Sequence, residues 1–253
     1  MERPFAGVAV NLSRYPQTVT GRTARLPLSG FPADIGTVSR FRNIIGLAMS
    51  TKPTVCIIES LGFLEEQVHK EGEIISRTLQ LSRKPSAYAY VRTKQELRAV
   101  IKEFGDSRHR YLHLSCHGLV DSNDNPVGFH LTTGNIGSDK LARLLAPHVD
   151  GRRVFLSACL AAKSTFAKTL LEESKCLSVL APLNEIAFDD AAVFWTSFYH
   201  LMFKSARRSM SAAHIKANVR ICASLVQEQF RLFQRQKDGS IKETTISPVK
   251  RRK

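Results

Sequence analysis

Apolar and polar positions follow two alternating periods from residue 54 towards the C-terminus. Short apolar runs rich in β-branched and aromatic side chains predict strands at 54–60, 86–92, 111–117, 152–159 and 176–183. Apolar residues spaced by three or four positions predict helices at 63–82, 94–104, 138–147, 163–173, 189–206 and 211–235. Strands that alternate with helices indicate βαβ units. The pattern therefore predicts an α/β fold with a mostly parallel sheet flanked by helices on both faces.

Two local signals refine this pattern. Thr93 and Glu96 have the spacing of a capping box, so we expect a helix to begin directly after Thr93. The stretch "GFHLTTGNIG" at 128–137 contains Gly134 and interrupts the alternation, which predicts a hairpin or a short excursion from the sheet.

The two ends of the chain differ from its middle. Residues 1–50 hold prolines at positions 4, 16, 27 and 32 among Gly, Ser, Thr and Arg, which predicts an irregular N-terminal arm. Regular patterning starts just after Met49, so translation starts at either Met1 or Met49. We expect one α/β domain over 51–237 and a basic C-terminal tail over 238–253.

The composition is that of a globular protein. The 253 residues, 43% of them hydrophobic, suffice for one domain with a substantial core. No apolar run reaches the roughly 18–20 residues of a membrane span, and the N-terminus lacks a secretory apolar segment. We therefore expect a soluble, cytoplasmic protein without a membrane partner.

Cysteine spacing and glycine motifs exclude several classes of site. The five cysteines are scattered and no two form a CxxC pair, which argues against a disulfide framework or a zinc cluster. Neither GxGxxG nor GxxxxGK[ST] occurs, so no nucleotide-binding loop is expected. We expect neither a cofactor nor a metal.

The net charge of +15 is concentrated at the ends of the chain. Residues 201–253 hold 13 Lys and Arg against 3 acidic residues, whereas residues 51–200 hold 18 against 17. A basic tail ending in "SPVKRRK" favours a solvated segment first. The alternative interpretation of this tail is that it binds nucleic acid or an acidic partner electrostatically.

A histidine and a cysteine end two successive strand-like runs. "YLHLSCH" ends at His117 and "RRVFLSAC" ends at Cys159. Sites in open α/β sheets form beyond the carboxyl ends of the strands, so the imidazole and the thiol can meet there if the two strands are neighbours. An imidazole beside a thiol favours the nucleophilic thiolate. The N–H groups of Gly118 and Cys159 are candidates for an oxyanion hole.

Other interpretations compete for these residues. A cysteine in an apolar strand is more often a small packing residue, and a lone histidine at a strand end is more often a hydrogen-bonded surface residue. Cys116 is the alternative thiol, but it should point to the face opposite His117. His113 lies deeper on the same face and is expected in the core, whereas His130 is expected on the hairpin.

The motifs "HLSCHG" at 113–118 and "VFLSAC" at 154–159 resemble the paired motifs of CHAT-domain proteins. These are caspase-like cysteine peptidases of the group that includes caspases and separase. The resemblance continues through "LSVLAPLNEIAFDDAAVFWTSFYHLMF" at 177–203 and spans roughly 54–225. It implies that 51–237 is a caspase-like domain, with His117 as general base and Cys159 as nucleophile.

The same resemblance implies an acidic residue that binds a basic substrate side chain. Glu185, Asp189 and Asp190 in "NEIAFDD" are the candidates, and Asp121 after His117 is a further one. The competing interpretation of Asp189 is a helix N-cap, because it directly precedes an apolar helical pattern.

The function implied is that of a cysteine endopeptidase acting on protein substrates through a thioester. The resemblance also implies a separate regulatory or sensor protein and a role in bacterial defence or programmed death. The alternative is an inactive caspase-like scaffold whose basic C-terminal region binds a protein or nucleic acid, although both His117 and Cys159 are retained. An amidotransferase-type hydrolase is disfavoured, because no glycine-rich nucleophile elbow surrounds Cys159.

Overall fold

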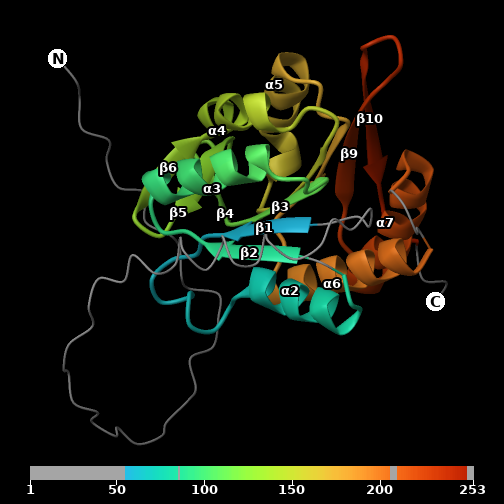
Figure 1. The fold of residues 1–253 in the computed structure, drawn as a ribbon, viewed down its shortest axis with the longest axis horizontal. Helices are drawn as coiled ribbons and strands as arrows, with labels where there is room; N and C mark the ends of the chain where they lie inside the picture. Colours follow the sequence, from blue (N-terminus) through green and yellow to red (C-terminus); the bar gives the residue numbers. More distant parts are fainter. Residues whose placement is uncertain (1–54, 85, 206–209, 250–253) are drawn as a thin grey trace, which may run out of the picture.

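The computed structural model describes residues 55–84, 86–205 and 210–249 (Figure 1). The predicted arm over 1–50, with both candidate start methionines, lies outside these residues. Among the described residues, no helix is both long and apolar enough to cross a bilayer.

A seven-stranded sheet forms the centre of the fold, in the order β10-β9-β8-β7-β3-β1-β2. Its five parallel strands are β1 (Val55–Glu59), β2 (Ser86–Tyr90), β3 (Tyr111–Ser115), β7 (Arg153–Ser157) and β8 (Ser178–Pro182). Two antiparallel strands, β9 (Phe230–Arg235) and β10 (Ile241–Ile246), complete one edge. The α/β fold with a mostly parallel sheet is therefore confirmed.

Within the described ranges, helices cover both faces of this sheet (Figure 1). One face carries α3 (Lys94–Asp106), α4 (Ser138–Leu145) and α5 (Phe166–Glu173); the other carries α2 (Glu71–Leu81), α6 (Phe188–Ser205) and α7 (Ala212–Val226). Thr93 caps α3 through the predicted capping box with Glu96. Helices on both faces were predicted, and they explain why the parallel strands read as continuous apolar runs.

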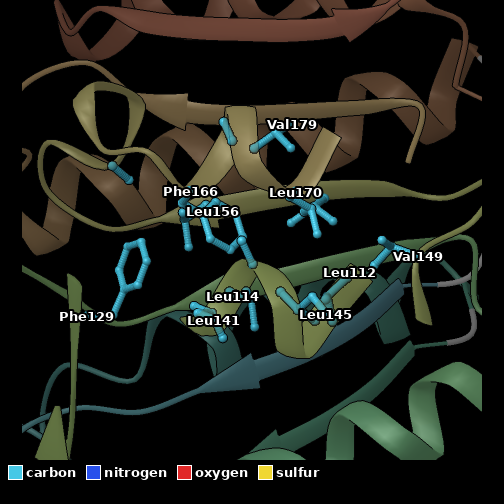
Figure 2. Close-up of a cluster of buried hydrophobic side chains, with 14 of the residues drawn as sticks. Leu112, Leu114, Phe129, Leu141, Leu145, Val149, Leu156, Phe166, Leu170 and Val179 are labelled. Carbon is cyan, nitrogen blue, oxygen red and sulfur yellow. The ribbon is translucent and has the colours of Figure 1, made fainter. Parts of the chain in front are cut away.

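The strand side chains alternate between two separate cores. On β3, Leu112 and Leu114 join the cluster under α3, α4 and α5, part of which Figure 2 shows, whereas Tyr111 joins the cluster under α2, α6 and α7. The latter cluster is built around buried aromatic rings of α6, including Trp195 and Phe198. The sheet is thus buried on both sides.

A small second sheet branches from the end of β3. It contains β4 (His117–Val120), β5 (Pro126–Leu131) and β6 (Gly134–Gly137), all antiparallel. The predicted strand 111–117 is therefore interrupted at Cys116, and His117 begins a strand of the second sheet. The hairpin expected at 128–137 is present as β5 and β6.

The predicted helices at 63–82 and 211–235 were both too long. The first begins only at Glu71, and turns occupy the residues before it. The second ends at Val226, since the C-cap residue Gln227 has a left-handed φ of 59°, and β9 follows. The residue spacing of 226, 230 and 233 mimics a helix, but Phe230 and Phe233 belong to opposite cores, as strand residues do.

The expected basic tail over 238–253 also differs from the structure. Residues 241–246 form β10 and pair with β9 along its whole length, so the boundary at 237 divides a hairpin. Ile246 is buried at the end of β10, whereas Val249 is 60% exposed.

Ile246→Ala should lower the free energy of unfolding by about 2–5 kcal/mol, since it deletes a buried side chain and leaves a cavity. Val249→Ala, the matched control, should change it by less than about 0.5 kcal/mol. Urea unfolding of the full chain measures both values. Equal midpoints for the two variants would show that β10 does not pack on the core.

Candidate functional site

The ends of β3 and β7 bring the predicted catalytic pair to one place. The two strands are parallel neighbours, with Ser115 directly opposite Ser157. The register continues past the strands, since the N–H of Cys116 donates to the carbonyl of Ser157 at 3.0 Å. His117 and Cys159 each lie two residues beyond this serine pair. The two strands are adjacent and parallel as predicted, while the approach of the imidazole to the thiol and the catalytic roles of both stay predictions.

Gly118 packs directly against the peptide group of Cys159. A Cβ atom at Gly118 would overlap the carbonyl oxygen of Cys159 and crowd its nitrogen. The position therefore requires glycine, because only glycine permits such a close approach of two backbones. This contact places the backbone of the histidine segment against that of the cysteine.

The imidazole of His117 is hydrogen-bonded to a residue that the sequence did not reveal. Its Nε2 lies 2.6 Å from Oε2 of Glu65, in the turn before α2. The same oxygen accepts the N–H of Gly62 at 3.1 Å. Phe188, the first residue of α6, contacts the imidazole edge-on at a centroid distance of 5.3 Å.

The thiol of Cys159 is hydrogen-bonded to backbone after β8. Its Sγ lies 3.6 Å from the carbonyl of Ile186 as donor and 3.5 Å from the N–H of Ile186 as acceptor. Burial raises the pKa of this thiol, the Ile186 N–H lowers it, and the negative charge of Glu185 raises it further. The thiol is therefore protonated at neutral pH in this arrangement.

A left-handed residue follows the cysteine. Leu160 has a φ of 58°, which is uncommon for a residue with a branched side chain. Its N–H donates to the carbonyl of Asn184 at 3.1 Å. The turn after β7 is thereby fastened to the loop after β8, the same loop that contacts the Cys159 thiol.

The predicted pocket acids divide into two groups. Asp189 is exposed, and its Oδ1 accepts the N–H of Asp190 within the first turn of α6. Asp190 is half-buried, and its negative charge adds to burial in raising the pKa of Glu228. Glu185 and Glu228 in turn both raise the pKa of the Cys159 thiol. Glu185, which is exposed like Asp189, and Glu228 therefore act electrostatically on the thiol, and Asp190 acts on Glu228.

Glu228 was missed because it lies inside the segment that the pattern predicted as helix. It precedes β9, which pairs with β8 and so brings the residue to the carboxyl end of β8. One sequence signal could have found it. It is one of 3 acidic residues among 13 basic ones in 201–253, and isolated acids in a basic segment are worth testing as site residues.

The remaining candidates have structural roles. Burial raises the pKa of the Cys116 thiol to about 12, which makes it a poor nucleophile. His113 is fully buried, as predicted, and its Nδ1 lies 3.1 Å from the Tyr199 hydroxyl. His130 on β5 pairs with Asn135 at 2.7 Å. Asp121 caps the β4–β5 turn by accepting the N–H groups of 123 and 125.

Two buried acidic side chains, Glu71 and Glu59, form hydrogen bonds that connect the strands and α2 beneath the site. Oε2 of Glu71 accepts from the hydroxyls of Ser157 at 2.9 Å and Ser115 at 3.4 Å, so it bridges the ends of β3 and β7. Glu59 accepts the N–H of Gly72 at 2.7 Å and the hydroxyl of Tyr88 at 2.7 Å. Since α2 has no side-chain cap of its own, Glu59 serves as its N-terminal acceptor.

Across the described ranges, no three His, Cys, Asp or Glu side chains converge in a way that could hold a metal ion. The reactive groups at this site are an imidazole, a thiol and carboxylates, all beyond the carboxyl ends of the parallel strands.

Comparisons with known proteins show similarity in fold but not in sequence. No family model and no curated protein matches the chain. A solved structure, the secreted C11 cysteine protease from Bacteroides thetaiotaomicron with an irreversible peptide inhibitor, is similar with a TM-score of 0.50 at 9% identity. The match covers 72% of this chain and 66% of that protease, so this chain spans about two thirds of its length. The separase of Saccharomyces cerevisiae, in complex with securin, reaches 0.42 at 14% identity over 75% of this chain and 12% of that one.

The chain therefore shares the caspase-like fold of a C11 cysteine protease. The predicted fold is confirmed. Membership of the CHAT group within that fold stays a prediction.

The buried Glu59 carboxyl should make stability depend on pH. Burial raises its pKa from 4.5 to about 7. Between these values the folded chain holds a proton that the unfolded chain has lost, so stability falls as pH rises through this window. The loss should be about 3 kcal/mol and should disappear in Glu59→Gln.

Urea unfolding at pH 4.5, 6 and 7.5 measures this loss. Glu172→Gln, at an exposed position of α5, is the matched control and should keep the wild-type slope. A Glu59→Gln variant with the same slope as the wild type would contradict the assignment.

Proposed function

We propose that this chain is a caspase-like cysteine peptidase in which Cys159 is the nucleophile and His117 the general base. The observation that carries the proposal is the continued register of β3 and β7, with Gly118 packed on the Cys159 peptide. The fold shared with a cysteine protease supports it. The resemblance of both motifs to CHAT-domain peptidases points to the same class.

The proposed reaction has two stages. His117 takes the thiol proton of Cys159, and the sulfur attacks the substrate carbonyl carbon to form a tetrahedral oxyanion. The carbon–nitrogen bond then breaks, the amine leaves with the proton from the imidazolium, and a thioester remains. Water, deprotonated by His117, hydrolyses the thioester and restores the thiol. In this proposal the N–H groups of Gly118 and Cys159 stabilise the oxyanion.

The acidic group beside the thiol supports a preference for basic substrates. Glu185, Asp190 and Glu228 are acidic residues at the carboxyl end of β8, and the charge of Asp190 adds to burial in raising the pKa of Glu228. A Lys or Arg side chain before the scissile bond would relieve that repulsion and pair with a carboxylate. Asp189, which faces solvent, is the weaker candidate.

The protonated thiol supports an activation step. In this arrangement the Cys159 thiol is hydrogen-bonded to Ile186 and its pKa is raised, so the resting enzyme lacks the thiolate. We propose that a protein substrate, aided by a separate regulatory protein, displaces the loop after β8 and frees the thiol. Bacterial defence is the proposed setting, because the motif resemblance implies it.

Cys159→Ala should abolish covalent labelling by a peptidyl acyloxymethyl ketone that carries Arg next to the reactive carbon. Cys116→Ala is the matched control and should label at the wild-type rate, because burial holds that thiol protonated. Mass spectrometry of the intact chain identifies the labelled cysteine. Labelling that persists in Cys159→Ala would overturn the proposed nucleophile, and no Cys159-dependent labelling in the presence of candidate activators would favour the scaffold function.

Asp190→Asn and Glu228→Gln should each slow cleavage after Arg by about tenfold to a hundredfold, the loss expected for one charge-assisted hydrogen bond. Cleavage after citrulline, the neutral isostere of Arg, should change little. Asp189→Asn, on the exposed side of the same helical turn, is the control. Ratios of kcat/KM for the two substrates measure the effect, and equal losses on both would show that these acids do not recognise charge.

A further inference from the structure

The turn before α2 holds its own carboxylate in place. Within it the N–H groups of Glu65 and Glu66 both donate to the carbonyl of Gly62 at 3.0 Å. The Gly62 N–H returns a hydrogen bond to Oε2 of Glu65 at 3.1 Å. The oxygen that contacts His117 is therefore fixed by the backbone of its own turn.

Residues at the ends of β2 and β5 hold this turn in place. Leu61, just before it, donates its N–H to the Tyr90 hydroxyl at 3.2 Å and accepts the Thr132 hydroxyl at 2.7 Å. Glu66 forms an ion pair with Arg92 at 3.0 Å. These contacts attach the turn to residues at the ends of β2 and β5, close to the site.

The other end of the turn closes over the imidazole. His69 stacks on Phe188 with a centroid distance of 4.5 Å, and Phe188 contacts the His117 ring edge-on. The side chains of His117 and Glu65 are 30% and 33% exposed, so water reaches the pair. Among the described residues, the His117 ring forms its hydrogen bond with Glu65.

An ionised carboxylate only accepts hydrogen bonds, so Nε2 of His117 must be the donor to Glu65. A neutral imidazole carries one N–H, and with that proton on Nε2 the lone pair is on Nδ1. A base oriented by a third group is the general arrangement that activates a nucleophile.

We infer that Glu65 is a positioning residue for His117, selecting the tautomer with the proton on Nε2 so that Nδ1 receives the Cys159 proton. This inference rests on the proposed function. The thiol proton moves to Nδ1, the sulfur keeps the electron pair, and the imidazolium forms beside the Glu65 carboxylate, whose charge stabilises it. The opposite role, a latch that blocks the base by occupying Nε2, would make removal of Glu65 accelerate Cys159.

The test uses the full chain and the variants Glu65→Ala, Glu65→Gln, Glu66→Gln and His117→Ala. The first measurement is the rate of Cys159 alkylation by iodoacetamide from pH 5 to 9, followed by mass spectrometry. The thiol, protonated at rest, reacts when it leaves Ile186 and passes its proton to His117. The second is the ¹⁵N spectrum of the His117 ring, which reports the tautomer without any substrate. Glu66→Gln is the matched control, since it lies in the same turn but pairs with Arg92.

Glu65→Ala should slow alkylation at neutral pH by about tenfold or more, as expected when a general base is misoriented. Its ring spectrum should shift from the Nε2–H form to a mixture of tautomers. Glu65→Gln should keep the Nε2–H form, because its amide oxygen still accepts, and should lose less rate. Glu66→Gln should match the wild type in both measurements.

A Glu65→Ala rate equal to or above the wild type, or an unchanged tautomer, would overturn the inference. The proposed function is tested separately by His117→Ala. A wild-type alkylation rate in His117→Ala overturns the dyad itself and the role of Glu65 with it. A slow His117→Ala beside a fast Glu65→Ala overturns only the role of Glu65.

Discussion

Ser115 and Ser157 lie opposite each other in the β3–β7 ladder, and both hydroxyls donate to the buried carboxylate of Glu71. Because the side-chain period of a strand is two, any slip of this register by one residue would turn His117 or Cys159 to the wrong face. The single carboxylate opposes that slip, since it is satisfied only when the two serines are level. The geometry of the whole site depends on this bridge.

Helix α2 links that bridge to the rest of the site. Glu71 is its first residue, Glu59 accepts the N–H of Gly72, and the turn before it contains Glu65. Its N-terminal dipole favours the negative charge gathered there, which offsets part of the desolvation of two buried acids. Packing of the same helix on α6 brings Phe188 and the turn together over the imidazole. Fold stability and site geometry thus share the same few residues.

The features that the sequence reveals are those governed by local patterns. Periodicity identifies the parallel strands, Thr93 and Glu96 mark the start of α3, and the strand ends that precede His117 and Cys159 are neighbours. The predictions that were wrong or missing concern contacts between residues far apart in the sequence. The spacing of apolar residues in 230–235 also fits a helix. The stretch is a strand because its backbone pairs with β8 and its apolar side chains are divided between the two cores. Glu65 meets His117 across 52 residues, and no local pattern marks such a pair.

The proposed base and the proposed nucleophile are carried by different sheets. His117 begins β4 of the small sheet, Cys159 follows β7 of the large one, and the peptide of Cys116 is the covalent joint between β3 and β4. The small sheet is attached to the large one at two neighbouring points: the N–H of Cys116 donates to the carbonyl of Ser157, and Gly118 packs on the peptide of Cys159. Because β4 takes no part in the ladders of the large sheet, the position of His117 relative to Cys159 depends on these two contacts and on the burial of the small sheet in the core.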